Sequence, residues 1–261
     1  MKNTSLAKWK SGNKSLGAWI SLSDVYATET LARMGFDWLC FDLQHGLISY
    51  THLLNLIPAL SGTGVTPLAR VSRNDAGEIG RVLDAGTQGV IVPLVNTAEE
   101  AAAAAAACRY PPRGHRSFGP LRAMLLDGPA YISAANDETA CIAMVETEEG
   151  LRNVRAIAAT PGIDAIFVGP MDLSFGLGIK PGDFDNPRFT AALRDIREAC
   201  DAAGCAAGIY GYSAEAAYAA LAQGFTFASA GNDSGFLREG ATAALKIAGA
   251  TPDTHEQKTG Y

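Results

Sequence analysis

Two short apolar runs, each followed by a carboxylate, decide how this chain folds: Ile142-Ala143-Met144-Val145-Glu146-Thr147 and Ile166-Phe167-Val168-Gly169-Pro170-Met171-Asp172-Leu173-Ser174. An apolar run of this length, bounded by Gly, Pro or charge, is typical of a buried parallel strand. Glu146 and Asp172 therefore follow two strands that are about one strand–helix unit apart in the chain. Together the two carboxylates predict a site for a hard divalent cation between adjacent strands.

Apolar and amphipathic runs alternate along the rest of the chain. We expect strands at residues 16–22, 38–43, 66–71, 89–95, 139–146, 165–170, 205–210 and 225–230, with helices between them. Eight such units predict an α/β fold, a single-domain (β/α)8 TIM barrel over residues 1–250, followed by a polar, disordered tail over 251–261. A doubly wound sheet is the alternative, but no GxGxxG motif follows the first strand.

The connections between strands vary in length. We expect a short helix at residues 127–136, after a Pro- and Gly-rich segment, and a long loop at 174–187.

Composition excludes several classes of protein. The formal net charge of −6 argues against non-specific nucleic-acid binding, and no apolar stretch approaches the ~20 residues of a membrane span. Five cysteines without a CxxC pair predict reduced thiols and a cytoplasmic protein.

In a barrel the chemistry lies at the C-terminal ends of the strands. The predicted strand ends carry Trp19, Ser21, Asp42, His45, Arg70, Asn96, Glu146, Asp172, Tyr210 and Asn232. For any one of these residues, capping of a helix is an alternative role; for Asp172 it is compatible with metal binding. Two carboxylates without a Cys/His cluster suit Mg²⁺ or Mn²⁺.

His45 and Arg70 are the candidates for proton transfer and charge stabilisation. His45 lies three residues after Asp42, which predicts a general base whose ring is oriented by that carboxylate; a structural histidine is the alternative. Arg70 ends an apolar strand and is expected to stabilise a carboxylate or an enolate, unless it pairs with a structural acid elsewhere. None of the seven lysines lies on a predicted strand, which argues against Schiff-base chemistry.

Six motifs give the chain a family resemblance. They are Gly35-Phe36-Asp37-Trp38, Asp42-Leu43-Gln44-His45-Gly46, Asp84-Ala85-Gly86-Thr87-Gln88-Gly89, Arg109-Tyr110-Pro111-Pro112-Arg113-Gly114, Glu146-Thr147 and Gly169-Pro170-Met171-Asp172-Leu173-Ser174. In this order they resemble the HpcH/HpaI family of class II pyruvate aldolases, over about residues 16–250.

The resemblance implies a barrel whose C-terminal helix is exchanged between protomers of a homo-hexamer, a trimer of dimers. It implies Mg²⁺, Mn²⁺ or Co²⁺ held by Glu146 and Asp172, without an organic cofactor. His45 would be the proton acceptor, Arg70 the transition-state stabiliser, and Asp84 a carboxylate that raises the basicity of the histidine. The backbone at Met171 and Asp172 would receive the substrate carboxylate.

Some positions depart from the family pattern. Gln44 stands where many members have Glu, Met144 where a Gln is common, and Met171 where a small Ala is common. Tyr210 and Asn232 occupy positions that are often apolar. Trp19, Met144, Met171 and Tyr210 are thus expected to form the wall that contacts the substrate.

These observations favour a metal-dependent aldolase that reversibly cleaves 4-hydroxy-2-oxo acids to pyruvate and an aldehyde. Hydroxypyruvate is a plausible alternative donor, because Met144, Ser117 and Tyr210 change the polarity of the pocket. One rival is an acyl-CoA lyase of the citryl or malyl thioester type, for which the cluster of Arg109, Arg113 and Arg116 offers few basic residues. The other is a non-catalytic 2-oxo-acid-binding protein.

Overall fold

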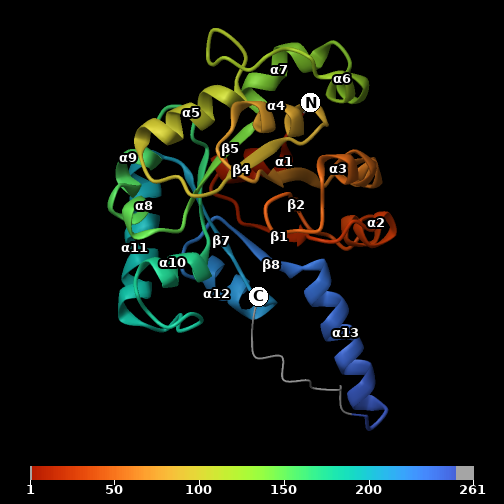
Figure 1. Ribbon diagram of the computed structural model, residues 1–261, viewed down its shortest axis with the longest axis vertical. Coiled ribbons are helices and arrows are strands. Elements are labelled where there is room, and N and C mark those ends of the chain that lie inside the picture. Colours follow the sequence, from red (N-terminus) through yellow and green to blue (C-terminus); the bar gives the residue numbers. More distant parts are fainter. Residues whose placement is uncertain (1, 251–261) are drawn as a thin grey trace.

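Eight parallel strands close into a barrel in the order in which they follow one another along the chain (Figure 1). The computed structural model describes residues 2–250. The strands are β1 (Ser15–Ile20), β2 (Trp38–Asp42), β3 (Thr66–Arg70), β4 (Gly89–Val92), β5 (Ala140–Val145), β6 (Ala165–Val168), β7 (Ala206–Tyr210) and β8 (Phe227–Asn232). This confirms the predicted barrel, because each observed strand overlaps a predicted one.

Side chains alternate between two cores along each strand, as the period of two in a strand requires. One core fills the barrel and includes Trp38, Leu68, Ile142, Phe167 and Phe227. The other lies between the strands and the surrounding helices. Strands buried on both faces explain why the sequence shows continuous apolar runs rather than polar alternation.

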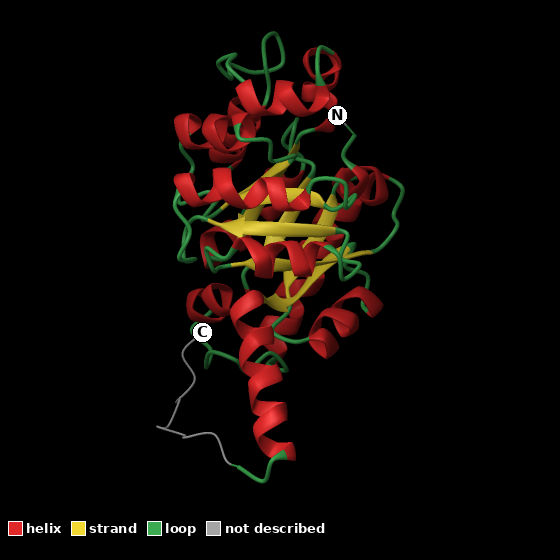
Figure 2. Ribbon diagram, turned by 90° about the vertical axis from the view of Figure 1, so that its right-hand side faces the viewer, coloured by secondary structure: helices red, strands yellow, loops and turns green. Residues whose placement is uncertain are grey.

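Helices surround the barrel (Figure 2). They are α2 (Val25–Ala32), α3 (Tyr50–Leu56) with the 3-10 turn η1 (Ile57–Leu60), α4 (Ala76–Asp84), α5 (Ala98–Cys108), α8 (Glu148–Arg152), α9 (Val154–Ala158), α11 (Pro187–Ala203) and α12 (Ala214–Ala222). Side-chain oxygens of Asp24, Asp75 and Thr97 accept hydrogen bonds from backbone N–H groups in the first turns of α2, α4 and α5. These caps fix where the helices begin.

A helix that was not predicted precedes the first strand. The helix α1 (Thr4–Lys10) covers the N-terminal end of the barrel, where the Trp9 ring stacks on Phe227 with centroids 4.2 Å apart. Leu6 and Trp9 are buried with the barrel interior. The first 14 residues contain four lysines, so the few apolar residues of this helix do not stand out as a pattern in the sequence.

Two predicted connections were wrong in detail. Between α5 and β5 the chain forms two helices, α6 (Leu121–Asp127) and α7 (Ala130–Glu138), where one at residues 127–136 was expected. The helix α10 (Pro170–Gly176) occupies the start of the expected loop at 174–187. Pro170 at the first helical position favours a helix there, since its missing N–H has no intrahelical partner to lose.

The last helix, α13 (Asp233–Ile247), projects away from the barrel (Figures 1 and 2). Only Asp233 of this helix is buried, whereas Leu237 is 68% and Ile247 89% exposed. The predicted exchange of this helix between protomers stays a prediction. The expected disorder at 251–261 lies outside the described residues. No helix among residues 2–250 is long and apolar enough to cross a membrane.

Candidate active site

The C-terminal mouth of the barrel gathers most of the predicted site residues. Trp19, Asp42, Arg70, Met144 and Tyr210 each stand at an inward-facing position at or next to the end of a strand. The register pairs Asp42 directly with Arg70 across β2 and β3. The period of two along each strand therefore brings together side chains that are far apart in the sequence.

Asp42 and Arg70 form a buried two-point ion pair. Nε of Arg70 donates to Oδ1 of Asp42 at 2.9 Å, and Nη2 donates to Oδ2 at 2.7 Å. Their side chains are only 6% and 10% exposed. Asp42 raises the pKa of Arg70, although burial opposes this shift. Arg70 is thus a fixed, permanently charged group at the mouth.

His45 is exposed and follows Asp42 in a tight loop. Oδ1 of Asp42 accepts hydrogen bonds from the backbone N–H groups of Gln44 and His45, at 3.1 and 3.2 Å. The expectation that Asp42 orients the imidazole was wrong for this structure, because Asp42 binds the loop backbone and Arg70 instead. Within residues 2–250 the imidazole has no hydrogen-bond partner, which leaves it accessible to a substrate proton.

Glu146 follows β5 and is buried, with 3% of its surface exposed. Burial, together with the charge of Asp172, raises its pKa to about 7, although Arg70 and the Leu94 N–H act in the opposite direction. A Cβ at Gly169 would lie 2.6 Å from Oε2 of Glu146 and 2.7 Å from Cε of Met144. Gly169 therefore makes room for both side chains.

Leu94 holds Glu146 in place, which no motif in the sequence indicates. Its N–H donates to Oε1 of Glu146 at 2.9 Å, and its φ of 54° is the only positive φ of a non-glycine among residues 2–250. Such strain costs of the order of 1–3 kcal/mol and persists where the surroundings require it. Here the positive φ directs the N–H of Leu94 toward the carboxylate of Glu146.

Asp172 lies in the first turn of α10 and is exposed. It is not the N-cap of this helix, which is Gly169. The helix begins without a side-chain cap, and its first intrahelical bond joins the N–H of Leu173 to the carbonyl of Gly169. The N–H groups of the first turn, at Met171 and Asp172, therefore lie outside the intrahelical pattern at the end of β6.

The donor set fits a hard divalent cation. Glu146 and Asp172 supply two carboxylates close enough for one charge to act on the other. Residues 2–250 contain no group of three or more His, Cys, Asp or Glu side chains arranged for a metal. One or two carboxylates with open positions for small molecules is the pattern that Mg²⁺ prefers.

Aromatic side chains line another part of the mouth. The Arg70 guanidinium lies over the Trp19 ring, 4.6 Å from its centroid, and Tyr210 meets Trp19 edge-on at 5.5 Å. The Tyr210 hydroxyl accepts a hydrogen bond from Nδ2 of Asn232 at 3.1 Å. Asn232 is the N-cap of α13, so the start of this helix is hydrogen-bonded to Tyr210.

Asp84 lies at the opposite end of the barrel. It ends α4, which runs back from the mouth, and its Oδ1 accepts from Nη2 of Arg116 at 2.6 Å. Ser117 lies next to Arg116, in the segment between α5 and β5. Within one chain neither residue reaches the mouth, so the roles predicted for Asp84 and Ser117 there stay predictions that would need a second chain.

The predicted basic cluster is neutralised at this end of the barrel. Arg109 pairs with Asp164, Arg113 with Asp137 and Arg116 with Asp84. None of these arginines is placed to bind a ligand at the mouth.

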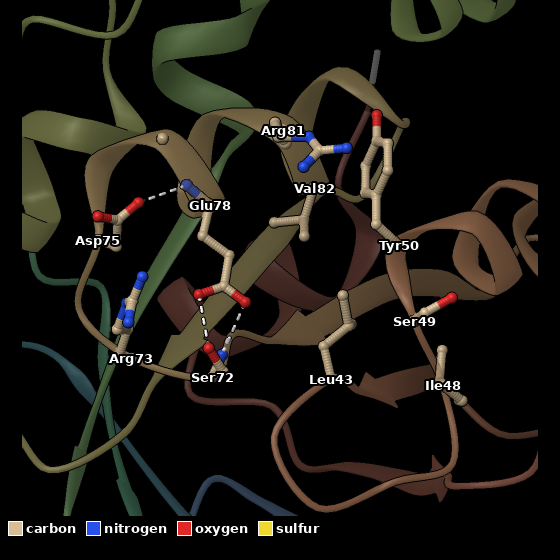
Figure 3. Close-up of a pocket in the computed structure, with 11 residues that line it drawn as sticks. Leu43, Ile48, Ser49, Tyr50, Ser72, Arg73, Asp75, Glu78, Arg81 and Val82 are labelled. Carbon is tan, nitrogen blue, oxygen red and sulfur yellow. Dashed lines mark hydrogen bonds between the residues drawn. The ribbon is translucent and has the colours of Figure 1, made fainter.

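A cavity of about 550 Å³ lies outside the barrel, between the β2–α3 loop and α4 (Figure 3). Its carboxylate Glu78 accepts from the Ser72 hydroxyl at 2.8 Å, and Arg81 lies over the Tyr50 ring. None of the predicted catalytic residues lines it.

Comparison with known proteins shows which family this chain resembles. Residues 15–240 match the model of a family described as HpcH/HpaI aldolase/citrate lyase. A hydroxypyruvate/pyruvate aldolase of Rhizorhabdus wittichii is 37% identical over 243 residues, covering 93% of this chain and 97% of the relative. One of Chromohalobacter salexigens is 41% identical, covering 88% and 91%. The crystal structure of an HpcH/HpaI aldolase/citrate lyase family protein from Burkholderia cenocepacia superposes with a TM-score of 0.88 at 30% identity, covering 95% and 100%.

Proposed function

The chain belongs to the HpcH/HpaI aldolase/citrate lyase family, and on this premise we propose how the residues of its barrel mouth carry out an aldolase reaction. The enzyme is a carbon–carbon lyase that reversibly cleaves 4-hydroxy-2-oxo acids to pyruvate, or hydroxypyruvate, and an aldehyde. The proposal concerns the metal, the residues and the assembly.

The buried carboxylate of Glu146 carries the proposal. A carboxylate with a pKa raised to about 7, beside the second carboxylate of Asp172, is unfavourable alone and is stabilised by a cation. Glu146 and Asp172 would hold Mg²⁺, Mn²⁺ or Co²⁺, and no organic cofactor is needed. When bound, the metal supplies a Lewis acid for the 2-oxo group.

Arg70 and His45 perform the proton and charge chemistry. In the synthetic direction His45 removes a proton from C3 of the 2-oxo acid, since its ring is exposed at the mouth. Arg70 stabilises the negative charge that moves to the 2-oxo oxygen. Asp42 occupies Nε and Nη2 of Arg70, which holds the guanidinium rigid and leaves Nη1 to face the substrate.

The first turn of α10 binds the substrate carboxylate. The backbone N–H groups of Met171 and Asp172 follow an uncapped helix start, where donors and the helix dipole favour an anion. Met144 and Trp19, both buried in the mouth, would then form the apolar part of the wall.

We further propose a homo-hexamer in the cytoplasm. Asp84 and its ion pair lie at the end of the barrel away from His45, so Asp84 can raise the basicity of His45 only from a second chain. The projecting α13 offers an apolar face for such a chain to cover. The five cysteines are free thiols, as expected in a reducing compartment.

No observation favours the two rivals. An acyl-CoA lyase would need cations at the mouth for the phosphates of CoA, whereas the clustered arginines are paired with acids at the other end. A binding protein without chemistry would not need a rigid Arg70 next to an exposed His45.

The test is pyruvate release from a 4-hydroxy-2-oxo acid with and without EDTA. We expect activity to disappear with EDTA and to return with Mn²⁺ or Mg²⁺. Glu146→Gln should lower kcat/KM at least about a hundredfold, whereas Glu149→Gln, an exposed glutamate three residues on, should not change it. Full activity in EDTA would refute the metal mechanism.

A further inference from the structure

Tyr210 places a hydroxyl group among the aromatic side chains of the mouth. It is the last residue of β7, and its ring meets Trp19 edge-on at 5.5 Å and Tyr212 edge-on at 4.9 Å. These contacts fix the plane of the ring. The hydroxyl group therefore has a defined position beside Trp19, over which Arg70 lies.

The hydrogen bond to Asn232 has one possible direction. Oδ1 of Asn232 accepts from the N–H of Gly235 at 2.7 Å and lies 3.1 Å from the Ser234 hydroxyl. This cap fixes which end of the amide is oxygen, so Nδ2 must face Tyr210, to which it donates at 3.1 Å. The oxygen of Tyr210 is an acceptor in this bond.

The hydroxyl proton of Tyr210 is therefore free to be donated. Among residues 2–250 the hydroxyl group donates no hydrogen bond. Burial raises the pKa of Tyr210, so the group keeps its proton at neutral pH. The indole Nε1 of Trp19, whose ring meets Tyr210 edge-on, is a second buried donor without a partner in the described part of the chain. The mouth thus presents unpaired donors beside the ring on which Arg70 rests.

We propose that Tyr210, held by Asn232, donates a hydrogen bond to the hydroxyl group on C3 of the donor substrate, so that the enzyme prefers hydroxypyruvate to pyruvate. The inference rests on the proposed function, in which Arg70 binds the 2-oxo oxygen and so brings C3 to the edge of the Trp19 ring. Hydroxypyruvate carries a neutral oxygen at C3, whereas pyruvate carries a methyl group that cannot accept a hydrogen bond. A site built to bond a hydroxyl discriminates against the analogue that lacks it.

The experiment measures deuterium exchange at C3 of pyruvate and of hydroxypyruvate in D₂O, with Mn²⁺ present and no aldehyde. In Tyr210→Phe, which keeps the ring contacts, the ratio of the hydroxypyruvate rate to the pyruvate rate should fall about tenfold. Asn232→Asp should give a similar fall. Aspartate still caps α13, but its carboxylate now accepts the Tyr210 proton and withdraws it from the substrate. In the control Tyr218→Phe, which changes an exposed tyrosine of α12, the ratio should not change.

A ratio that stays within twofold in Tyr210→Phe would overturn the inference. An equal loss for both donors would also overturn it, because it would assign Tyr210 a role common to both substrates. A fall in Tyr210→Phe without one in Asn232→Asp would overturn the part played by Asn232. Exchange of neither donor by the wild-type enzyme would refute the proposed function itself, and with it this inference.

Discussion

At each end of the barrel an arginine is buried against an aspartate, but the two arginines differ in how many of their N–H groups have hydrogen-bond partners. At the mouth, Arg70 gives two N–H groups to Asp42, and Asp42 also accepts two backbone N–H groups. At the other end, Arg116 gives one bond to Asp84, and its Nε and Nη1 are buried without a hydrogen-bond partner among residues 2–250.

The difference shows which part of the site one chain completes by itself. A buried guanidinium that is held by two hydrogen bonds to one carboxylate is in place before the substrate arrives, which favours catalysis. A buried guanidinium with missing partners costs free energy in the isolated chain. One chain therefore fixes Arg70 at its own mouth, whereas the end that carries Asp84 is an arrangement that a neighbouring chain would complete.

Removing Asp42 should have the largest effect on stability. Asp42→Ala leaves the Arg70 charge buried without compensation, and we expect a loss of about 3–5 kcal/mol in the free energy of unfolding, measured with urea. The double variant Asp42→Leu/Arg70→Met should recover most of this loss, because no charge is then left buried. A loss under ~1 kcal/mol in Asp42→Ala would contradict the difference between the two ends.

The pH dependence of stability should report Glu146 in the metal-free enzyme. Its folded-state pKa of about 7 lies above the ordinary value of 4.5, so the folded chain binds the proton more tightly than the unfolded chain. Stability should then fall as the pH rises from about 4.5 to about 7, by up to about 3 kcal/mol relative to Glu146→Gln.

Titration of the midpoint of urea unfolding, wild type against Glu146→Gln, measures this effect. Mn²⁺ should reverse it above pH 7 in the wild-type enzyme and not in the variant, since the cation stabilises the charged carboxylate. A difference between the two proteins that does not vary with pH would show that Glu146 ionises normally.

Asp84→Ala should destabilise the chain less than Asp42→Ala. The Asp84 side chain is 27% exposed, so water partly screens its attraction to the buried Arg116, and we expect a loss of about 1–2 kcal/mol. Arg113→Ala is the control, because the Arg113–Asp137 pair is exposed and should contribute within ~0.5 kcal/mol. Equal effects of Asp84→Ala and Asp42→Ala in thermal or urea unfolding would remove the distinction between the two ends.

The strands could be predicted because a strand that is buried on both faces has an uninterrupted run of apolar residues. The mouth followed from the strand ends, and Glu146, Arg70 and Tyr210 lie where that argument placed them. The pairing of Asp42 with Arg70 was left open, yet the two residues end neighbouring strands at inward positions in register. The order of the strands, together with the alternation of inward and outward side chains along each strand, would have predicted this ion pair.

Other features leave no trace in the residue pattern. The positive φ of Leu94 depends on the closed barrel, since leucine does not favour that conformation by itself. The hydrogen bond from Asn232 to Tyr210 arises from the end of β8 lying beside the end of β7. The place of Asp84 could have been read from its position late in α4, because a helix that follows a strand returns to the other end of the barrel.

The stability of helix α13 should depend on the concentration of the protein. A fifteen-residue helix that buries one side chain against its own chain has little to hold it in water. If the proposed assembly covers it, the free energy that keeps it folded comes from association and weakens on dilution. Asn232 links the cap of this helix to Tyr210, so dilution would also loosen the substrate wall. Substrate preference and assembly would then vary together.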